Sequence, residues 1–431
     1  MATDTQPPHP SGLQVAVIGA GPAGFYASEA LLKAGARVDL IDRLPFPHGL
    51  VRYGVAPDHQ HTKGATKLFD RTAGMPGFRF FGNVEFGTDL ELKQLREQYH
   101  AVLLCVGCQA GRRLGIPGED LASCYSSLSF VNGYNGHPDA VDFAPDLSSE
   151  AAVVVGNGNV ALDVARLLLK PSEALQETDI PEAVLAGFAQ SKIRTVHVLG
   201  RRGLEHSSFR SPEIAELAKM ESLQVEIRNP EIANEPEERA QQKVVATIQA
   251  LTTPRPTASR KLILHYHTKV VDWDGSRARC VDTRLTETAA RKTEAQGSTA
   301  DIPAGLLVSC IGYLGVEQSD LPFDHGTIPN AAGFVQPGVY VAGWIKRGPS
   351  GLIGNNKACA RESAERLLAD FADQELTPRE PDWFGSMSKP TFSYDDWLAL
   401  DSEEKARGKI LDRPRIKFRT AAEAAGFLEK S

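Results

Sequence analysis

The sequence predicts an α/β protein with two Rossmann-like, three-layer dinucleotide-binding domains. Two glycine-rich segments carry this prediction: VAVIGAGPAG at 15–24 and AAVVVGNGNVALDVA at 151–165. Each begins as an apolar, strand-like run, passes through a glycine turn and continues as a helix-like run. A second strand-like run follows each helix, RVDLID ending at Asp42 and TVHVLG ending at Gly200. This order is that of the βαβ unit that binds dinucleotides, and 431 residues suffice for two or three domains.

The first fingerprint has every part that a pyrophosphate-binding turn needs. Gly19 permits the tight turn, Gly21 lets the backbone approach a pyrophosphate, and Gly24 lets helix and strand pack closely. The start of the helix supplies unpaired N–H groups and the positive end of its dipole. Asp42, 18 residues beyond Gly24, stands where a ribose hydroxyl would need an acceptor. We therefore expect a dinucleotide with a free ribose hydroxyl here, and a position so near the N-terminus is typical of FAD-binding domains.

The second fingerprint reads GxGxxA and ends differently. Its turn residues are Gly156, Asn157, Gly158, Asn159 and Val160. Gly200 stands roughly where an NAD site would place a carboxylate, and two arginines, Arg201 and Arg202, come next. Guanidinium groups can hold a 2′-phosphate through charge-assisted hydrogen bonds, whereas a carboxylate would repel it. The pattern predicts NADP(H), although an arginine pair after a strand can also be merely solvated.

Composition excludes several other classes of protein. The net charge of −7 argues against a nucleic-acid partner, which needs a basic face. No apolar run approaches the ~20 residues of a membrane span. The opening segment MATDTQPPHPSG has Asp4 and no Lys or Arg, unlike a secretory signal or a transit peptide, so we expect a cytoplasmic protein.

The cysteines favour a structural role. Six scattered cysteines suit a reducing compartment. Cys105 and Cys108 form a CxxC, which could be a redox pair or half of a metal site. However, the pair ends the apolar strand AVLLC, and no second CxxC completes a metal set. We expect no metal site and a structural role for both thiols.

The intervening chain is expected to follow a simple plan. Residues 45–64, rich in Gly, Pro and His, read as a long functional loop, and 109–150 read as a connector. Residues 223–310 read as short strands alternating with polar turns. A Gly-rich loop and a long helix follow the strand GVYVAGW at 338–344, and the last ~60 residues read as a tail that wraps the surface.

These motifs together resemble the adrenodoxin reductase-type ferredoxin–NADP⁺ reductases, within the glutathione reductase-like flavoproteins. The resemblance runs from about residue 13 to 420. The segments that carry it are GAGPAGFYASEALLKAG, GLVRYGVAPDH, GNGNVALDVARLLL, SKIRTVHVLGRRG, GWIKRGPSGLIG and the tail WLALDSEE…RPRIKF. The chain departs from the family pattern after Gly203, where it reads LEHSSFR, and at Gln60, which follows Asp-His. These departures concern the partner surface and the positioning of the nicotinamide rather than the fold.

The resemblance implies a discontinuous FAD domain, residues 1–108 with 335–431, and an NADP domain inserted at 109–334. It also implies which residues contact each cofactor. Those expected to line the FAD, besides the first fingerprint, are Ala23, Asp42, Leu50, Phe86, Trp344, Gly351, Leu352 and Ile353. Asn157–Val160 would hold the NADP pyrophosphate, and Arg201 and Arg202 the 2′-phosphate. His59 and Glu213 would lie near the nicotinamide and tune hydride transfer, although a backbone-bonded loop histidine and a first-turn helix acid are the alternatives.

The implied activity is that of a ferredoxin–NADP⁺ reductase. Hydride transfer between NADPH and FAD would be followed by single-electron transfer to an iron–sulfur protein such as ferredoxin. Two alternatives remain: a flavin-dependent monooxygenase, and an electron-input subunit of a larger enzyme, as in the small subunit of glutamate synthase. Because ferredoxins are typically acidic, a local basic patch would have to steer their approach. The candidate patch residues are Arg210, Arg255, Arg260, Lys261 and Lys269.

Overall fold

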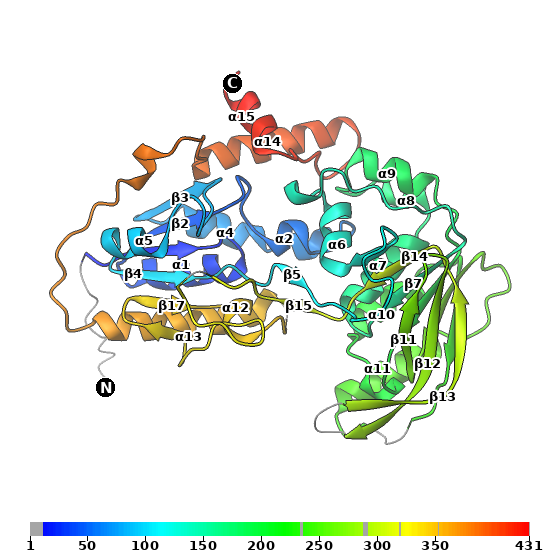
Figure 1. Ribbon diagram of the computed structural model, residues 1–431. Helices are drawn as coiled ribbons and strands as arrows, with labels where there is room; N and C mark the ends of the chain where they lie inside the picture. Colours follow the sequence, from blue (N-terminus) through cyan, green and yellow to red (C-terminus); the bar gives the residue numbers. More distant parts are fainter. Residues whose placement is uncertain (1–11, 233–235, 288–291, 319, 352, 431) are drawn as a thin grey trace, which may run out of the picture. The chain divides into compact units, whose positions relative to one another are not determined.

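The computed structural model describes residues 12–232, 236–287, 292–318, 320–351 and 353–430. The chain divides into two units, which Figure 1 shows with the sequence coloured from blue to red. Unit 1 comprises 1–110, 135–141 and 313–431, and unit 2 comprises 111–134 and 142–312.

Unit 1 is built on a mostly parallel sheet. Among the described residues, six strands lie in the order β16-β17-β4-β1-β2-β3. Their bounds are β1 Gln14–Ile18, β2 Arg37–Asp42, β3 Phe78–Gly82, β4 Ala101–Leu104, β16 Phe334–Gln336 and β17 Val339–Val341. β16 is antiparallel to β17, whereas β17, β4, β1, β2 and β3 are parallel to their neighbours. The carboxyl ends of these five strands therefore meet at one edge of the sheet.

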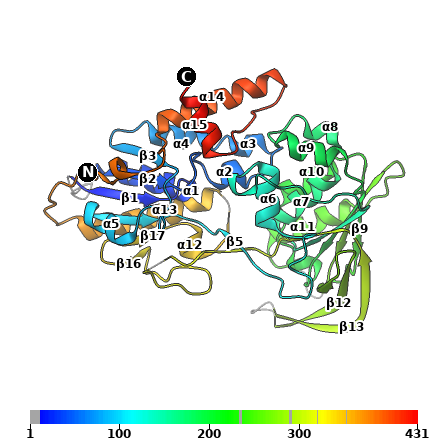
Figure 2. The ribbon, with the colours of Figure 1, turned by 45° about the horizontal axis from the view of Figure 1, so that its top comes forward.

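Both faces of this sheet are buried. Val15 and Val17 of β1 belong to a hydrophobic cluster with α1 (Pro22–Lys33) and α13 (Ile353–Phe371), which pack against each other (Figure 2). Ala16 and Ile18 face the opposite cluster, to which α5 (Leu92–Gln98) contributes. Helix α1 stops before Gly35, whose φ of +83° ends it as the sequence predicted. This burial on both sides explains why the strands read as continuous apolar runs.

The remaining helices of unit 1 lie around this sheet. They are α2 Leu50–Tyr53, α3 Gln60–Lys63, α4 Thr66–Ala73, η1 Pro138–Ala140, α12 Trp344–Arg347, η3 Trp383–Ser386, α14 Tyr394–Ile410 and α15 Ala421–Leu428. The two C-terminal helices bury Trp397, Leu400 and Phe418 in a cluster with residues that follow β2. The C-terminal segment is therefore held to the body of unit 1 by its own apolar core.

Unit 2 repeats the parallel design. Among its described residues, six strands lie in the order β6-β14-β7-β8-β10-β9 and pair in parallel. Their bounds are β6 Cys124–Ser126, β7 Ala151–Val155, β8 Thr195–Leu199, β9 Leu223–Arg228, β10 Arg260–His265 and β14 Leu306–Ser309. The helices are α6 Ser127–Asn135, α7 Asn159–Leu169, α8 Ser172–Leu175, α9 Glu182–Ala189, η2 Leu204–His206, α10 Ser211–Ala218 and α11 Arg239–Ala250.

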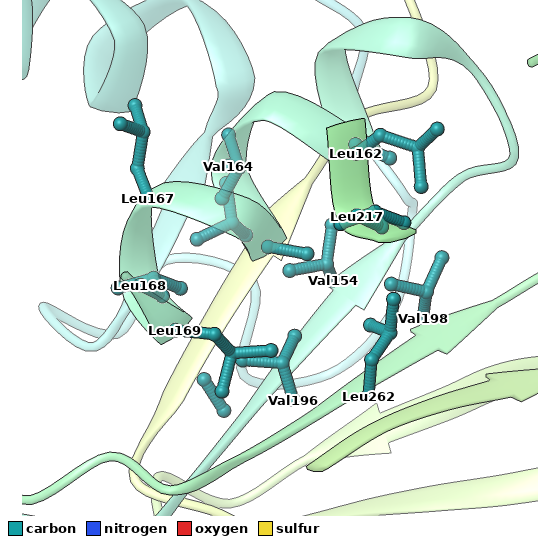
Figure 3. Close-up of a cluster of buried hydrophobic side chains, with 14 of the residues drawn as sticks. Val154, Leu162, Val164, Leu167, Leu168, Leu169, Val196, Val198, Leu217 and Leu262 are labelled. Carbon is teal, nitrogen blue, oxygen red and sulfur yellow. The ribbon is translucent and has the colours of Figure 1, made fainter. Parts of the chain in front are cut away.

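One face of the unit 2 sheet is covered by helices and the other by a second sheet. Figure 3 shows leucines of α7 meeting Val154 of β7, Val196 of β8 and Leu217 of α10. On the other face lies an antiparallel sheet whose strands are β11 Thr268–Trp273, β12 Arg277–Glu287 and β13 Lys292–Pro303. Its Val270 and Trp273 share a cluster with Val153. Two short strands, β5 Ala110–Gly111 and β15 Tyr313–Leu314, pair where the chain passes from one unit to the other.

Three expectations about the intervening chain were wrong. The predicted loop 45–64 contains α2 and α3, the predicted connector 109–150 contains β6 and α6, and the predicted strand region contains helix α11. α11 was missed because only Val244, Val245 and Ile248 are buried in a mostly polar segment. The short helices were missed because neighbouring parts of the chain, rather than local apolar periodicity, hold them in place.

The division into units also differs from the predicted domain limits. Residues 135–141 fall inside the predicted insertion but group with unit 1, and the second crossing lies at 312/313 rather than 334/335. Long-range hydrogen bonds, including one ion pair, explain the first difference. Arg43 holds Asp139 through two hydrogen bonds of 3.0 and 2.5 Å, and Arg419 donates to the carbonyl of Ala140 at 2.8 Å. The cofactor assignment of each domain stays a prediction. In the part of the chain that is described, no helix has the length and apolar character needed to cross a membrane.

Candidate dinucleotide-binding sites

The first fingerprint forms a tight turn whose outer glycines are required by the fold. Gly19 has φ of +107°, and a Cβ there would lie 2.6 Å from the carbonyl oxygen of Cys105. A Cβ on Gly24 would overlap the carbonyl oxygen of Gly19. These two glycines therefore let β1, α1 and the end of β4 approach closely, as the sequence predicted.

Gly21 is different, because nothing in the described protein crowds it. Its φ of −84° suits any residue, and an added Cβ would meet no atom within 4 Å. It is the N-cap of α1, and no side chain caps the first N–H groups of this helix. Gly49 lies against it, since a Cβ on Gly49 would be 2.9 Å from the Gly21 Cα. An open turn at a helix N-terminus is the surface that a pyrophosphate needs.

Asp42 closes the turn from the neighbouring strand. Its Oδ2 accepts the N–H of Ala20 at 2.6 Å, and its Oδ1 accepts the N–H of Leu44 at 2.8 Å. Burial raises the pKa of Asp42, while these two hydrogen bonds act in the opposite direction. Each carboxylate oxygen keeps a second lone pair, so the group can accept a hydroxyl donor as well.

The second fingerprint repeats this geometry in unit 2. Gly156 has φ of +137°, and a Cβ there would overlap the carbonyl oxygen of Cys310. Gly158 is the N-cap of α7 with φ of −121°, and an added Cβ would meet no atom within 4 Å. Both turns therefore pair a glycine that the fold requires with a glycine that faces open space. We conclude that unit 2 also presents an open helix N-terminus able to bind a pyrophosphate.

The hydrogen bonds show which residues are equivalent in the two turns. The N–H of Gly19 donates to Ile41 at 2.7 Å, and that of Gly156 donates to Leu199 at 2.9 Å. By this register Gly200 corresponds to Asp42. A Cβ at Gly200 would overlap the side-chain amide of Asn157, which fills the space that a carboxylate would need.

Arg201 and Arg202 come directly after Gly200, and hydrogen bonds to their backbone carbonyls fix this segment. The carbonyl of Arg201 accepts the Thr283 hydroxyl at 2.7 Å, and that of Arg202 accepts the N–H of His267 at 3.2 Å. The side chain of Arg201 is exposed and that of Arg202 is half-buried. Arg201 and Arg202 thus place positive charge after the carboxyl end of β8. At the corresponding position in unit 1, Asp42 places negative charge at the end of β2.

The same comparison explains the CxxC. Cys105 donates its N–H to Ile18 and Cys310 donates its N–H to Val155, both at 2.7 Å. Cys105 therefore directly follows β4, and Cys310 directly follows β14, so each lies beside the strand that leads into a glycine turn. The six cysteines lie within the described residues and form no disulfide bond, and burial raises the pKa of the Cys105 thiol. Cys108 is also buried, so neither thiol has the exposed thiolate character of a reactive pair. Within the described residues no group of three or more His, Cys, Asp or Glu could hold a metal ion.

Two further residues predicted to contact the flavin lie at the carboxyl edge of the unit 1 sheet. Ala23 is buried in α1, and Gly343, with φ of +75°, packs so closely that a Cβ would lie 2.7 Å from the Ala23 methyl group. Trp344 follows β17 and stacks on Tyr313 with ring centroids 5.8 Å apart. The indole Nε1 of Trp344 is buried and has no hydrogen-bond partner among the described residues. A buried donor without an acceptor fits a bound ligand at this position.

The other predicted flavin residues are less closely grouped. Leu50 is the first residue of α2, directly after Gly49. Phe86 follows β3 and packs against the hydrophobic cluster on the α5 side of the sheet. Gly351 has φ of +77° and Ile353 begins α13, whereas Leu352 lies outside the described residues.

The two residues predicted near the nicotinamide belong to different units. His59, in unit 1, is the half-buried N-cap residue of α3. Glu213, in unit 2, occupies the first turn of α10, and its Oε1 lies 3.6 Å from Nη1 of Arg210. The other carboxylate oxygen, Oε2, is buried and lacks a hydrogen-bond partner among the described residues. Glu213 therefore retains an acceptor for a ligand.

The predicted basic patch is partly occupied by structural contacts. Arg255 donates to the carbonyls of Met220 and Ala218 at 2.7 and 2.9 Å, where it satisfies the end of α10. Lys261 pairs with Glu226 at 2.7 Å. Lys269 is exposed on β11. Arg260, on β10, approaches the carbonyl of Ile193 at 3.5 Å.

A separate pocket lies at the opposite, amino edge of the unit 1 sheet. Its volume is about 480 Å³, and its lining includes His100 and Gly338, which directly precede β4 and β17. The ligand crevice of an open α/β sheet lies at the carboxyl edge. This pocket is therefore not a candidate for either fingerprint ligand.

Comparisons with known proteins agree with this geometry. The sequence profile of the pyridine nucleotide-disulphide oxidoreductase family matches residues 13–231. NADPH-ferredoxin reductase FprA of Mycobacterium tuberculosis is 37% identical over 95% of this chain and 97% of its own length. The mitochondrial NADPH:adrenodoxin oxidoreductase of Arabidopsis thaliana is 36% identical over 95% and 94%. The chain belongs to this reductase family.

Solved structures extend the likeness to the fold. The structure of Mycobacterium tuberculosis FprA in complex with NADPH superposes with a TM-score of 0.91 at 35% identity, covering 96% of this chain and 98% of that one. A thioredoxin reductase from T. acidophilum, 17% identical with a TM-score of 0.50, shares the fold alone. The resemblance and the α/β fold class inferred from the sequence are confirmed. The protein is an oxidoreductase.

Proposed function

We propose that the protein is a ferredoxin–NADP⁺ reductase that binds FAD in unit 1 and NADP(H) in unit 2. One observation carries the assignment of cofactors: two open glycine turns of the same backbone plan are followed by a carboxylate in one unit and by two arginines in the other. Membership of the reductase family supports the activity. When bound, FAD supplies the change from two-electron hydride chemistry to one-electron transfer.

The unit 1 residues would bind and orient the flavin nucleotide. The N–H groups at the start of α1 and the open space at Gly21 receive the pyrophosphate, and Asp42 accepts a ribose hydroxyl. The free indole N–H of Trp344 donates to a polar atom of the cofactor. Leu50 and Phe86 provide apolar contacts, and the backbone at Gly351 and Ile353 approaches the flavin ring.

The unit 2 residues would select and place the nicotinamide nucleotide. Residues 157–160 receive the pyrophosphate at the start of α7, and Arg201 and Arg202 hold the 2′-phosphate. The unpartnered oxygen of Glu213 accepts a donor on the nicotinamide. His59, in unit 1, is the second residue that the family resemblance implies near the nicotinamide. Their role is to orient the nicotinamide for hydride transfer, not to carry a covalent intermediate.

The electron acceptor would be ferredoxin or a similar small, acidic iron–sulfur protein. Because the whole chain carries a net charge of −7, a local positive surface must guide the encounter. Lys269, which is exposed on β11, is the better candidate. Arg255 bonds to the end of α10, and Lys261 and Arg210 lie beside Glu226 and Glu213. Reversing the charges of Arg260 and Lys261 tests the basic patch predicted from the sequence. An unchanged rate of electron transfer to ferredoxin at low salt would exclude that patch. We expect the enzyme to act in the cytoplasm.

An anaerobic titration of the purified protein tests the proposal. We expect a yellow protein whose visible bands bleach with NADPH far more readily than with NADH, and which is reoxidised by ferredoxin or cytochrome c. In the variant Arg201→Ala/Arg202→Ala, each lost charge-assisted hydrogen bond costs about 1.5–3 kcal/mol. The loss of at least two such bonds should lower NADPH affinity roughly a hundredfold or more, while NADH affinity stays the same. The matched control is Arg284→Ala, which removes an exposed arginine of the same unit from β12.

Other outcomes would identify other functions. A colourless protein that FAD cannot reconstitute would overturn the assignment of unit 1. An equal response to NADPH and NADH would overturn that of unit 2. Reoxidation only by oxygen in the presence of an organic substrate would indicate a monooxygenase. Copurification of an equimolar large protein would indicate an electron-input subunit.

A further inference from the structure

The C-terminal segment 393–430 carries a fully buried carboxylate that pairs with an arginine from the start of the chain. Glu404 of α14 has no exposed surface, and its oxygens accept two hydrogen bonds from Arg52, of 2.9 and 2.5 Å. The same carboxylate also accepts from Arg415 at 2.9 Å and from the N–H of Phe418 at 2.9 Å. Two guanidinium groups and one backbone N–H therefore satisfy this carboxylate.

Arg52 is enclosed on its remaining sides by aromatic rings. Its guanidinium carbon lies 5.1 Å from the ring centre of Phe46, 5.2 Å from that of Tyr53 and 5.0 Å from that of Trp397. Burial acts to lower the pKa of Arg52, but the charge and hydrogen bonds of Glu404 hold it above its ordinary value. Removing one partner of such a buried pair leaves the other uncompensated, which costs far more than a surface pair.

Arg52 sits in the one-turn helix that borders the first glycine turn. Helix α2 begins at Leu50, and its N-cap is Gly49, whose φ of +48° and close approach to Gly21 fix how α2 meets the turn. A helix of four residues has no stability of its own. Its position must therefore come from tertiary contacts, and the pair with Glu404 is a buried ion pair among those that the side chains of α2 make.

A second contact holds the far end of the same loop. Lys63, the last residue of α3, donates to the side-chain oxygen of Asn135 at 3.2 Å, and Lys417 donates to the backbone carbonyl of Asn135 at 2.8 Å. The N–H of Lys63 bonds to the carbonyl of His59 at 3.2 Å. The C-terminal segment thus holds the loop 49–63 at both ends, through Glu404 and through Lys417.

We propose that Arg52 and Glu404 are positioning residues for cofactor binding and hydride transfer: their buried pair holds the loop 49–63, and with it Leu50 and His59, against the glycine turn of unit 1. This inference rests on the proposed function, because it takes FAD as the occupant of that turn. The C-terminal segment then serves the site from a distance, although none of its residues belongs to either fingerprint.

The test compares Glu404→Gln with the matching variant of another buried carboxylate that pairs with an arginine in the same unit. Gln keeps the size of Glu404 but removes the charge that holds Arg52, and its NH2 group cannot accept the two hydrogen bonds that one carboxylate oxygen accepts. The control is Asp39→Asn, because Asp39 is equally buried and accepts two hydrogen bonds from Arg79, of 2.8 and 2.7 Å, away from the loop. The readouts are the dissociation constant of FAD from the apoprotein, followed by flavin fluorescence, the visible circular dichroism of the bound flavin, and the rate of flavin reduction at saturating NADPH.

Both variants should lower the melting temperature, but only Glu404→Gln should change the site. If the loop keeps its native position in about a tenth of the molecules, FAD affinity falls about tenfold, and misplacement of reacting groups slows reduction by roughly tenfold to a hundredfold. Arg52→Lys keeps the charge but loses the two-pronged bond. It should show the same changes to a smaller extent, and it replaces Glu404→Gln if that variant does not fold.

Contrary results are distinct from failure of the proposed function. If wild-type protein binds FAD, and Glu404→Gln or Arg52→Lys binds and reduces it as Asp39→Asn does, the pair is structural only and the inference is wrong. If wild-type protein binds no FAD, the proposed function fails first.

Discussion

Replacing Gly158 by alanine separates what the second glycine turn does for the fold from what it does for the ligand. Gly158 has φ of −121°, which alanine adopts without strain, and the added methyl group would meet no protein atom within 4 Å. The folded state therefore loses nothing, while the unfolded chain becomes less flexible. Such a change stabilises a protein by about 0.4–1 kcal/mol.

The cost falls on the ligand instead. The methyl group occupies the space in which a pyrophosphate would approach the N-terminus of α7. Inserting a methyl group into a well-packed contact costs typically about 1–3 kcal/mol. At about 1.4 kcal/mol per tenfold change, NADPH should bind roughly fivefold to a hundredfold more weakly.

Two measurements on the same sample check this prediction. Thermal unfolding of Gly158→Ala should match or slightly exceed that of the wild type, and equilibrium titration with NADPH should give the weaker dissociation constant. FAD binding should be unchanged, because Gly158 lies in unit 2. An NADPH dissociation constant within a factor of two of the wild-type value would refute the reasoning that the open space at Gly158 belongs to the pyrophosphate.

Three further predictions follow from the same structure. Gly156→Ala should lower the free energy of unfolding by about 2–5 kcal/mol, because φ of +137° and the overlap with Cys310 both oppose a side chain; a urea melt matching wild type would contradict it. Trp344→Phe keeps the stacking on Tyr313 but loses the unpartnered indole N–H, so FAD should dissociate about two- to tenfold more readily in a fluorescence titration, with stability unchanged. Burial lowers the pKa of His48 to about 3, so the folded state stays neutral while the unfolded chain takes up a proton below about pH 6.5. This contribution to stability is complete above pH 6.5 and is lost as pH falls toward 3, with a slope of up to about 1.4 kcal/mol per pH unit; urea unfolding across this range should give a shallower slope for His48→Phe, and equal slopes would count against the assignment.

The sequence was sufficient for the two βαβ units because their signals are local. Gly19 and Gly156 each follow an apolar strand. In the structure both have a positive φ and pack closely against the carbonyl group that follows the neighbouring strand. Gly35 ends α1 as expected. These features depend on residues within one turn or one strand of each other, so a single sequence can reveal them.

The parts that could not be predicted depend on contacts between distant residues. Arg52 and Glu404 are 352 positions apart, and neither has a local pattern that marks it as half of a buried pair. Residues 135–141 group with unit 1 because Arg43, Lys63 and Lys417 donate hydrogen bonds to them. No change in amino-acid composition along the sequence indicates these contacts. The indole N–H of Trp344 became a candidate only when the structure showed it buried without a partner. The roles of His59 and Glu213 stay predictions, because each lies in a different unit.

The equivalence of the two turns leads to a last prediction, about cofactor preference. Ala20 and Asn157 occupy the same position, after the first glycine of each turn, and Asp42 corresponds to Gly200. Ala20 leaves room for the Asp42 carboxylate, which bonds to the Ala20 N–H, whereas the Asn157 side chain fills the corresponding space at Gly200.

Gly200→Asp alone should therefore lose NADPH without gaining NADH, because the new side chain overlaps Asn157. The double variant Gly200→Asp/Asn157→Ala recreates the unit 1 arrangement and should raise kcat/KM for NADH relative to NADPH, since a carboxylate accepts ribose hydroxyls and repels a 2′-phosphate. Asn157→Ala alone is the control and should keep the preference for NADPH, because Arg201 and Arg202 remain. If Gly200→Asp by itself shifted the preference to NADH, Asn157 would not be the residue that reserves this space. The difference between the two cofactor sites would then reside in the arginines alone.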